Sequence, residues 1–147
     1  MLIRDIMAIH PAYIRTGADM RRAAEIISLS EISDLMVIDL DNVFIGVLSE
    51  GDLVRAILPD FDEVLRAGGT LNDAFSFLVQ KGRDLANRPI DPYIIRNAIT
   101  VKTTDDIAQA VVVMVEKQIR RLPVVDDGKL MGTVSRADVC RAVIYYA

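Results

Sequence analysis

An internal repeat constrains the fold of this chain more than any other feature of its sequence. Residues 14–57 align with residues 101–143, with one residue of slack at a loop. Identical residue pairs extend along the whole alignment: Thr16/Thr103, Asp19/Asp106, Ala23/Ala110, Ile32/Ile119, Leu35/Leu122, Val37/Val124, Asp39/Asp126, Gly46/Gly132, Ser49/Ser135, Asp52/Asp138, Arg55/Arg141 and Ala56/Ala142. Accidental similarity between two amphipathic stretches is the alternative. The extent of the match favours two copies of one supersecondary unit.

Both copies also repeat the same hydrophobic pattern. Apolar residues recur at i, i+3, i+4 and i+7 in the helical stretches, and each helix is preceded by residues suited to capping. The predicted elements, for the first and then the second copy, are a strand at 13–15 and 100–102, a helix at 20–27 and 107–114, a strand at 35–38 and 122–125, a return strand at 43–48 and 130–134, and a last helix with Leu53, Ala56 and Ile57 or Val139, Ala142 and Val143 on its apolar face. Each copy therefore has the predicted order β-α-β-β-α.

The predicted fold class is α/β (α+β), with two β-α-β-β-α repeats packed face to face around a pseudo-two-fold axis. One copy cannot cover its small sheet on both faces, so the two sheets are expected to cover each other. We divide the chain into a first repeat (1–58), a helical insert and linker (59–91) and a second repeat (92–147). The insert is interpreted as a packed connector or as a dimer or partner surface. A cleft between the repeats is the expected place for a small ligand.

Composition excludes several classes of function. A net charge of −4 argues against a nucleic acid or an anionic membrane bound by bulk electrostatics. The longest apolar run, Ala110–Val115, is too short to cross a bilayer. The single cysteine, Cys140, rules out an intramolecular disulfide and is expected to be a buried small hydrophobe. No secretory signal, catalytic residue or metal site is predicted, His10 is expected at the surface, and the default localisation is cytoplasmic.

On these residues the chain resembles a tandem pair of cystathionine-β-synthase-type (CBS) domains. The resemblance depends on the repeated element order, the acidic turn followed by a strand glycine, and the Ser-x-x-Asp step at 49–52 and at 135–138. The segment Asp5-Ile6-Met7 before the first repeat is also typical. The resemblance implies a stand-alone regulatory, allosteric module that binds an adenine nucleotide or nucleoside (AMP, ADP, ATP or S-adenosylmethionine). It also implies a homodimer, with output through that dimer or a regulated partner protein.

The two Ser-x-x-Asp steps have two interpretations. Ser49 with Asp52, and Ser135 with Asp138, each fall where a strand runs into a helix. A capping role would satisfy free amides and stabilise each helix by about 1 kcal/mol. The resemblance implies instead that each carboxylate accepts hydrogen bonds from the ribose hydroxyls, with the serine beside the sugar.

Arg120 and Arg121 are the candidate phosphate ligands. Guanidinium groups pair with phosphate oxygens in a bidentate geometry, although adjacent arginines are also common on solvated surface. The first copy has Ser33 and Asp34 at these positions, and a carboxylate there would repel a phosphate. We therefore expect unequal pockets: the pocket of the second copy binds a phosphorylated adenosine, and that of the first binds a ligand whose tail is uncharged, or nothing.

The adenine slot is predicted from apolar residues around the start of the second copy's strands. The candidates are Thr100, Val101, Ile119, Leu122, Pro123 and Val124. Met36 replaces Pro123 in the first copy, and core packing is the alternative role for each of these residues. Two other functions stay open: a dimeric structural or interaction protein with no ligand in the cleft, and a nucleotide-hydrolysing enzyme, for which the sequence offers no base or metal site.

Overall fold

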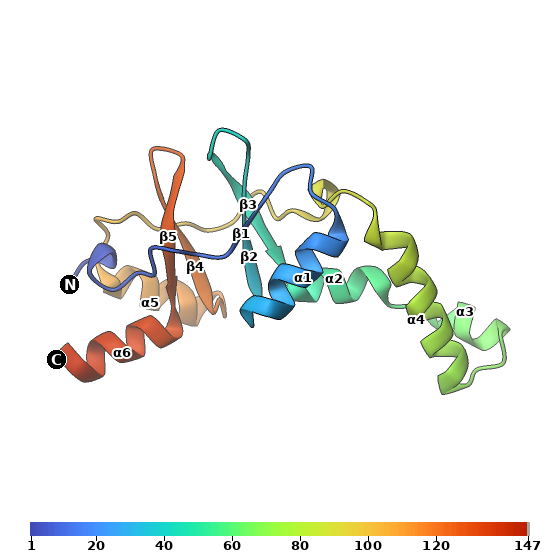
Figure 1. Cartoon of the computed structure of the whole chain (residues 1–147). Helices are drawn as coiled ribbons and strands as arrows, with labels where there is room; N and C mark the ends of the chain where they lie inside the picture. The colour runs from blue at the N-terminus through green and yellow to red at the C-terminus, as the bar shows by residue number, and fades with distance from the viewer. Residues whose placement is uncertain (147) are drawn as a thin grey trace.

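The computed structural model describes residues 1–146 and divides them into two sheet-and-helix units with a helical insert (Figure 1). The first unit contains β1 (Tyr13–Arg15), α1 (Met20–Ser30), β2 (Asp34–Ile38), β3 (Phe44–Ser49) and α2 (Glu50–Ile57). The second contains α5 (Ile107–Glu116), β4 (Arg121–Asp126), β5 (Lys129–Ser135) and α6 (Arg136–Tyr146). The insert contains α3 (Phe61–Arg66) and α4 (Leu71–Ala86), and short 3-10 turns η1 (Ile3–Asp5) and η2 (Asp91–Tyr93) precede the two units.

The first strand of the second copy is shorter than predicted. In the first unit β1 pairs in parallel with β2, so that the sheet has three strands. In the second unit the predicted strand at 100–102 is reduced to one parallel bridge between Val101 and Val124. The Val101 N–H donates to the Pro123 carbonyl (3.0 Å), and the Val125 N–H donates to the Val101 carbonyl (2.8 Å). The position of the strand was therefore predicted correctly, but its length was not.

The two hairpins have the same register, which confirms the repeat alignment. Asp34 pairs with Ser49 and Val37 with Gly46 across β2 and β3. The aligned residues pair in the same way across β4 and β5: Arg121 with Ser135 and Val124 with Gly132. Because the side-chain period of a strand is two, a shared register places aligned side chains on corresponding faces of the two sheets.

The segment just before the first strand of each repeat pairs with the other repeat. Ala8 exchanges two backbone hydrogen bonds with Thr133 of β5, at 2.8 and 3.0 Å. Ile95 exchanges the matching pair with Val47 of β3, at 2.8 and 3.1 Å. Figure 1 shows the N-terminus beside the second unit. The hydrophobic core of each repeat therefore contains residues from both parts of the chain.

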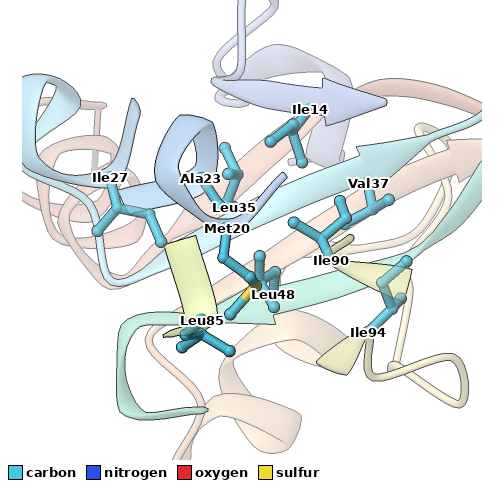
Figure 2. Close-up of a cluster of buried hydrophobic side chains, with 10 residues drawn as sticks. All are labelled: Ile14, Met20, Ala23, Ile27, Leu35, Val37, Leu48, Leu85, Ile90 and Ile94. Carbon is cyan, nitrogen blue, oxygen red and sulfur yellow. The ribbon is translucent and has the colours of Figure 1, made fainter. Parts of the chain in front are cut away.

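Two hydrophobic cores follow from this pairing. The first consists of Ile14, Met20, Ala23, Ile27, Leu35, Val37, Leu48, Leu85, Ile90 and Ile94, which Figure 2 labels. The second consists of Ile3, Ile6, Val101, Ala110, Met114, Leu122, Val124, Val134 and Ala142. Ile3 and Ile6 precede the first strand of the first repeat, and Ile90 and Ile94 precede the first strand position of the second. Each core is thus completed by residues that lie just before the first strand of the other repeat.

The sheet faces turned away from the helices are buried as well. Met36 and Pro123 are fully buried, although they belong to neither core. The hairpins touch at their turns, where the Phe44 N–H donates to the Gly128 carbonyl at 2.8 Å. Figure 1 shows β2 and β3 next to β4 and β5, with the helices below them. The two sheets therefore cover each other, as the fold class predicts.

The insert is packed at one end and exposed at the other. Leu85, near the end of α4, enters the first core, and Figure 2 shows it close to Leu48. Leu71 and Phe75, at the start of α4, are exposed. The end of α4 is thus a packed connector. In contrast, α3 and the start of α4 extend away from the second unit (Figure 1).

The expectation for Cys140 is wrong, because its side chain is exposed on α6. It follows Val139 by one residue, a rotation of about 100° that moves the side chain off the face bearing buried Ala142. His10 is exposed, as predicted. None of the helices within residues 1–146 is long and apolar enough to cross a membrane.

Candidate functional site

A pocket of about 350 Å³ lies where the two repeats meet, at the beginning of β4 and α6. It is lined by Glu31, Ile32 and Ser33 from the first repeat and by Arg120, Arg121, Ser135, Arg136 and Ala137 from the second. The lining therefore includes three arginines, two serines and one glutamate. Such a lining favours an anionic ligand.

The cationic side of the pocket is partly fixed by hydrogen bonds. Arg121 is half-buried at the first position of β4, and its Nη1 donates to Thr133 Oγ1 at 2.9 Å. Arg120 is exposed, so its guanidinium is accessible from solvent. The structure brings both predicted phosphate ligands into one pocket with Ser135.

Arg136 is a third cation that the sequence analysis did not identify. Its Nη2 donates to the Met114 carbonyl in the last turn of α5 (3.1 Å), and its Nε donates to the Ile119 carbonyl just beyond that helix (3.1 Å). Carbonyls at a helix C-terminus attract a cation, so this guanidinium has a defined position at the pocket edge. The signal for it was present in the sequence, since Arg136 directly follows the serine of the second Ser-x-x-Asp step.

The second Ser-x-x-Asp step forms a reciprocal helix cap. Asp138 Oδ2 accepts hydrogen bonds from the Ser135 N–H (2.8 Å) and the Ser135 hydroxyl (2.7 Å). Ser135 Oγ in turn accepts from the Asp138 N–H at 3.2 Å. Asp138 Oδ1 has a more distant neighbour, the Arg141 guanidinium at 3.8 Å. The capping interpretation thus accounts for one carboxylate oxygen of Asp138.

The first Ser-x-x-Asp step uses both carboxylate oxygens. Ser49 Oγ donates to Asp52 Oδ2 at 2.7 Å, and Arg55 Nη2 donates to Asp52 Oδ1 at 2.5 Å. Burial acts to raise the pKa of Asp52, but the hydrogen bonds from Ser49 and Arg55 outweigh it, so the pKa lies below its ordinary value. The aligned aspartates therefore differ in how firmly the second oxygen is engaged.

Asp34 introduces a carboxylate close to the arginines. It is half-buried at the first position of β2, where the Ser33 hydroxyl donates to its Oδ2 at 3.2 Å. Burial raises the pKa of Asp34 above its ordinary value; the Ser33 hydrogen bond and the positive charges of Arg121 and Arg120 oppose this rise, and the charge of Glu50 adds to it. The expected difference in charge between the two copies is therefore located at the junction of the repeats.

The residues predicted for the adenine slot are not part of the pocket lining. Val101, Leu122 and Val124 belong to the second core, and Pro123 is fully buried. Thr100 is exposed and Ile119 is half-buried. The structure thus separates these residues from the arginines, and contact with a base remains a prediction for them.

A second, larger cavity of about 800 Å³ adjoins the first. It lies between α1, α2 and α4, and its apolar lining includes Met20, Ala24, Ile27, Leu53, Ile57 and Leu85. Ser33 and Arg120 line both cavities. This cavity could not be predicted from the repeat because one of its walls is α4, which has no counterpart in the other copy.

The comparison with protein families identifies the class of this protein. The CBS domain model matches residues 3–59 and 90–145, which together make up most of the chain. The chain belongs to the CBS domain family, as the repeated Ser-x-x-Asp steps suggested. The two matched segments correspond to the two repeats.

Similar sequences occur in archaea and plants. The protein MJ1426 of Methanocaldococcus jannaschii is 28% identical, and the alignment covers 98% of this chain and 92% of that protein. The chloroplastic CBS domain-containing protein CBSX1 of Arabidopsis thaliana is 30% identical over 89% of this chain, which spans 58% of CBSX1. This chain therefore matches nearly all of one relative and little more than half of the other.

Solved structures share the fold. CBSX2, determined in complex with AMP, has a TM-score of 0.74 at 24% identity, covering 97% of this chain and 96% of that one. The CBS domain pair of MJ0100, in complex with 5′-methylthioadenosine and S-adenosyl-L-methionine, has a TM-score of 0.69 at 21% identity, covering 97% and 95%. At these identities the likeness establishes the fold of a CBS domain pair.

Proposed function

We propose that this chain is a regulatory module that binds an adenine nucleotide between its two repeats. The observation that carries the proposal is the pocket across the repeat boundary, whose lining includes Arg120, Arg121 and Arg136. Guanidinium groups recognise phosphate by bidentate, charge-assisted hydrogen bonds. The CBS pairs of CBSX2 and MJ0100, which bind adenosine compounds, support the same ligand class here.

The charge of the pocket favours AMP, ADP or ATP over S-adenosylmethionine. The sulfonium group of S-adenosylmethionine would place a positive charge beside the arginines, whereas a phosphate would pair with them. The second repeat supplies all three arginines, so we propose that its side of the cleft is the preferred nucleotide site.

Asp138 is the proposed ribose ligand. Its Oδ2 is engaged by Ser135, but its Oδ1 is 3.8 Å from the nearest cation, Arg141. Oδ1 can therefore accept hydrogen bonds from ribose hydroxyls while the helix cap stays intact. The equivalent oxygen of Asp52 is already paired with Arg55 at 2.5 Å. This difference supports unequal sites, with Ser49 and Asp52 forming the weaker one.

The proposed output is a change in packing or assembly. A ligand that contacts both repeats shifts the protein toward the arrangement it binds best. We propose a homodimer whose subunit contacts respond to this shift, or a regulated partner protein that detects it. In this account the chain is a binding module and has no enzymatic activity.

A thermal-shift screen against AMP, ADP, ATP, S-adenosylmethionine and GMP tests this proposal. One adenine nucleotide should raise the melting temperature of the wild type, because a ligand that binds only the folded state stabilises it. Arg121→Ala should lose this rise. Arg66→Ala is the matched control: it removes an exposed arginine from α3 and should keep the full rise.

A second candidate function is a dimeric interaction protein with no ligand in the cleft. Exposed apolar side chains on the insert favour it: Phe61, Leu65, Leu71 and Phe75. In that case no compound in the screen raises the melting temperature, and substitution of Phe75 with Asp changes the oligomeric state measured by light scattering.

A further inference from the structure

The pseudo-two-fold axis places opposite charges at equivalent positions of the two repeats. Asp34 pairs with Ser49 across the first hairpin, as Arg121 pairs with Ser135 across the second. The preceding residues have matching backbone bonds: the Ser33 carbonyl accepts from the Glu50 N–H at 2.9 Å, and the Arg120 carbonyl from the Arg136 N–H at 3.0 Å. The backbone is thus equivalent on both sides, and the side-chain charge is not.

Charged groups from several segments surround the Asp34 carboxylate or line the adjoining pocket. The charges that act on Asp34 are those of Glu50, at the start of α2, and of Arg120 and Arg121, at the start of β4. Glu31 and Arg136 are the other charged residues that line the pocket. Ser33, which lines the pocket, donates its hydroxyl to Asp34 at 3.2 Å. No ion pair within 4 Å joins Asp34 to either arginine in residues 1–146, so the positive charges of Arg121 and Arg120 favour its ionised form from a longer distance.

A bound phosphate would offset the positive charge that Arg120 and Arg121 present to Asp34. The carboxylate would lose the positive charge that favours ionisation, and it would gain an anionic neighbour. Burial already raises the pKa of Asp34 above its ordinary value, so ionisation is disfavoured before any ligand arrives. Protonation relieves the repulsion and makes the carboxyl group a hydrogen-bond donor.

We propose that Asp34 is a proton-linked counter-charge of the phosphate site: it is ionised in the free protein at neutral pH and takes up a proton when a phosphate group binds Arg120 and Arg121. This inference rests on the proposed function and deepens it, because it names a residue that selects ligands by charge. A neutral adenosine would bind without proton uptake.

The sign of the pH dependence follows from this linkage. Because the ligand raises the pKa of Asp34, the proton and the phosphate favour each other's binding. Affinity for a phosphorylated ligand should be highest below the pKa of the free protein. It should fall by up to about tenfold per pH unit between the free and bound pKa values, and become constant above both.

Isothermal titration calorimetry with AMP tests the inference. Titrations at pH 6.5 in buffers of different ionisation enthalpy give the number of protons taken up. Wild type should take up more protons than Asp34→Asn, which removes the charge and keeps the shape. The difference between the two proteins cancels the titration of the AMP phosphate itself. At pH 7.5 Asp34→Asn should bind AMP about tenfold more tightly, since an adjacent like charge has been removed.

Two controls separate the charge of Asp34 from net charge. Asp62→Asn removes an exposed carboxylate from α3 and should reproduce the wild-type uptake and affinity. Adenosine should bind wild type and Asp34→Asn with equal proton uptake. An NMR titration of the Asp34 carboxyl carbon needs no substitution: saturation with AMP should raise its pKa, and an unmoved or lowered pKa refutes the inference.

The outcomes distinguish this inference from the proposed function. Equal proton uptake and equal AMP affinity in wild type and Asp34→Asn overturn the inference and leave nucleotide binding in place. Failure of the wild type to bind AMP, ADP or ATP overturns the proposed function, and the inference with it.

Discussion

Replacement of Gly132 with alanine is expected to destabilise the protein, because the N-terminal segment pairs with β5 directly over this residue. A Cβ atom at this position would overlap the carbonyl oxygen of Ala8. Ala8 and Thr133 exchange two backbone hydrogen bonds, at 2.8 and 3.0 Å. The position of a Cβ atom is fixed by its own backbone and the oxygen of Ala8 is a backbone atom, so a side-chain rotation cannot relieve the clash.

The expected magnitude follows from what the clash displaces. Loss of two backbone hydrogen bonds costs about 2 kcal/mol. If Ile3 and Ile6 also leave the second core, the cost rises to about 5–8 kcal/mol, because each buried isoleucine contributes roughly 1.5–3 kcal/mol. The free energy of unfolding should therefore fall by about 2–8 kcal/mol, with a melting temperature lower by roughly 3 °C per kcal/mol.

Urea unfolding followed by circular dichroism measures this loss, and Gly82→Ala is the matched control. Gly82 lies inside α4, and an added Cβ there would meet no atom within 4 Å. Alanine at that site should stabilise the protein by about 0.5–1 kcal/mol. A Gly132→Ala protein as stable as the wild type would refute the close approach of the N-terminal segment to β5.

Three further predictions test separate parts of the structure. Leu85→Ala should lower the free energy of unfolding by about 2–4 kcal/mol in a urea titration because it leaves a cavity in the first core, whereas Leu71→Ala, at a 90% exposed position, should change it by less than about 0.5 kcal/mol. Because the folded pKa of Asp52 is lowered, its ionised form contributes stability that is present above the ordinary pKa of 3.8 and is lost as pH falls through the folded pKa. Asp52→Asn should thus be less stable than wild type at pH 7, and melting curves should show the difference shrinking toward pH 3. Cys140 should react with a thiol reagent in the native state at nearly the rate seen in denaturant, and a large protection factor would contradict its exposure.

The features that the sequence predicted correctly are those encoded locally or by the repeat. The aligned pairs Asp34/Arg121 and Ser49/Ser135 have the same register in both hairpins, because the hydrophobic alternation of each strand sets its pairing. The Ser-x-x-Asp steps form helix caps because a cap depends on residues three apart in the chain. Repeat identity and capping chemistry therefore sufficed for the element order. Arg120 and Arg121 were predicted instead as adjacent cations at the start of a strand, where the first copy has Ser33 and Asp34.

The features that the sequence did not predict depend on contacts between distant segments. An apolar pattern at Ile3 and Ile6 indicates burial, but it does not specify which of two equivalent repeats supplies the core. The large cavity requires the end of α4, where Leu85 packs, and the repeat offers no template for it. The prediction for Cys140 was wrong because a shift of one residue along α6 is enough to move a side chain from the buried face of the helix to the exposed face.

Binding of AMP to Asp138→Ala, measured by calorimetry beside the wild type and Asp73→Ala, tests the central claim most directly. Asp73 forms the same reciprocal cap with Thr70 on α4, so its removal reproduces the loss of a cap away from the repeat junction. We predict that the wild type and Asp73→Ala bind AMP equally, and that Asp138→Ala binds it at least about tenfold more weakly. Equal affinity in all three proteins would contradict a nucleotide site formed by the second Ser-x-x-Asp step.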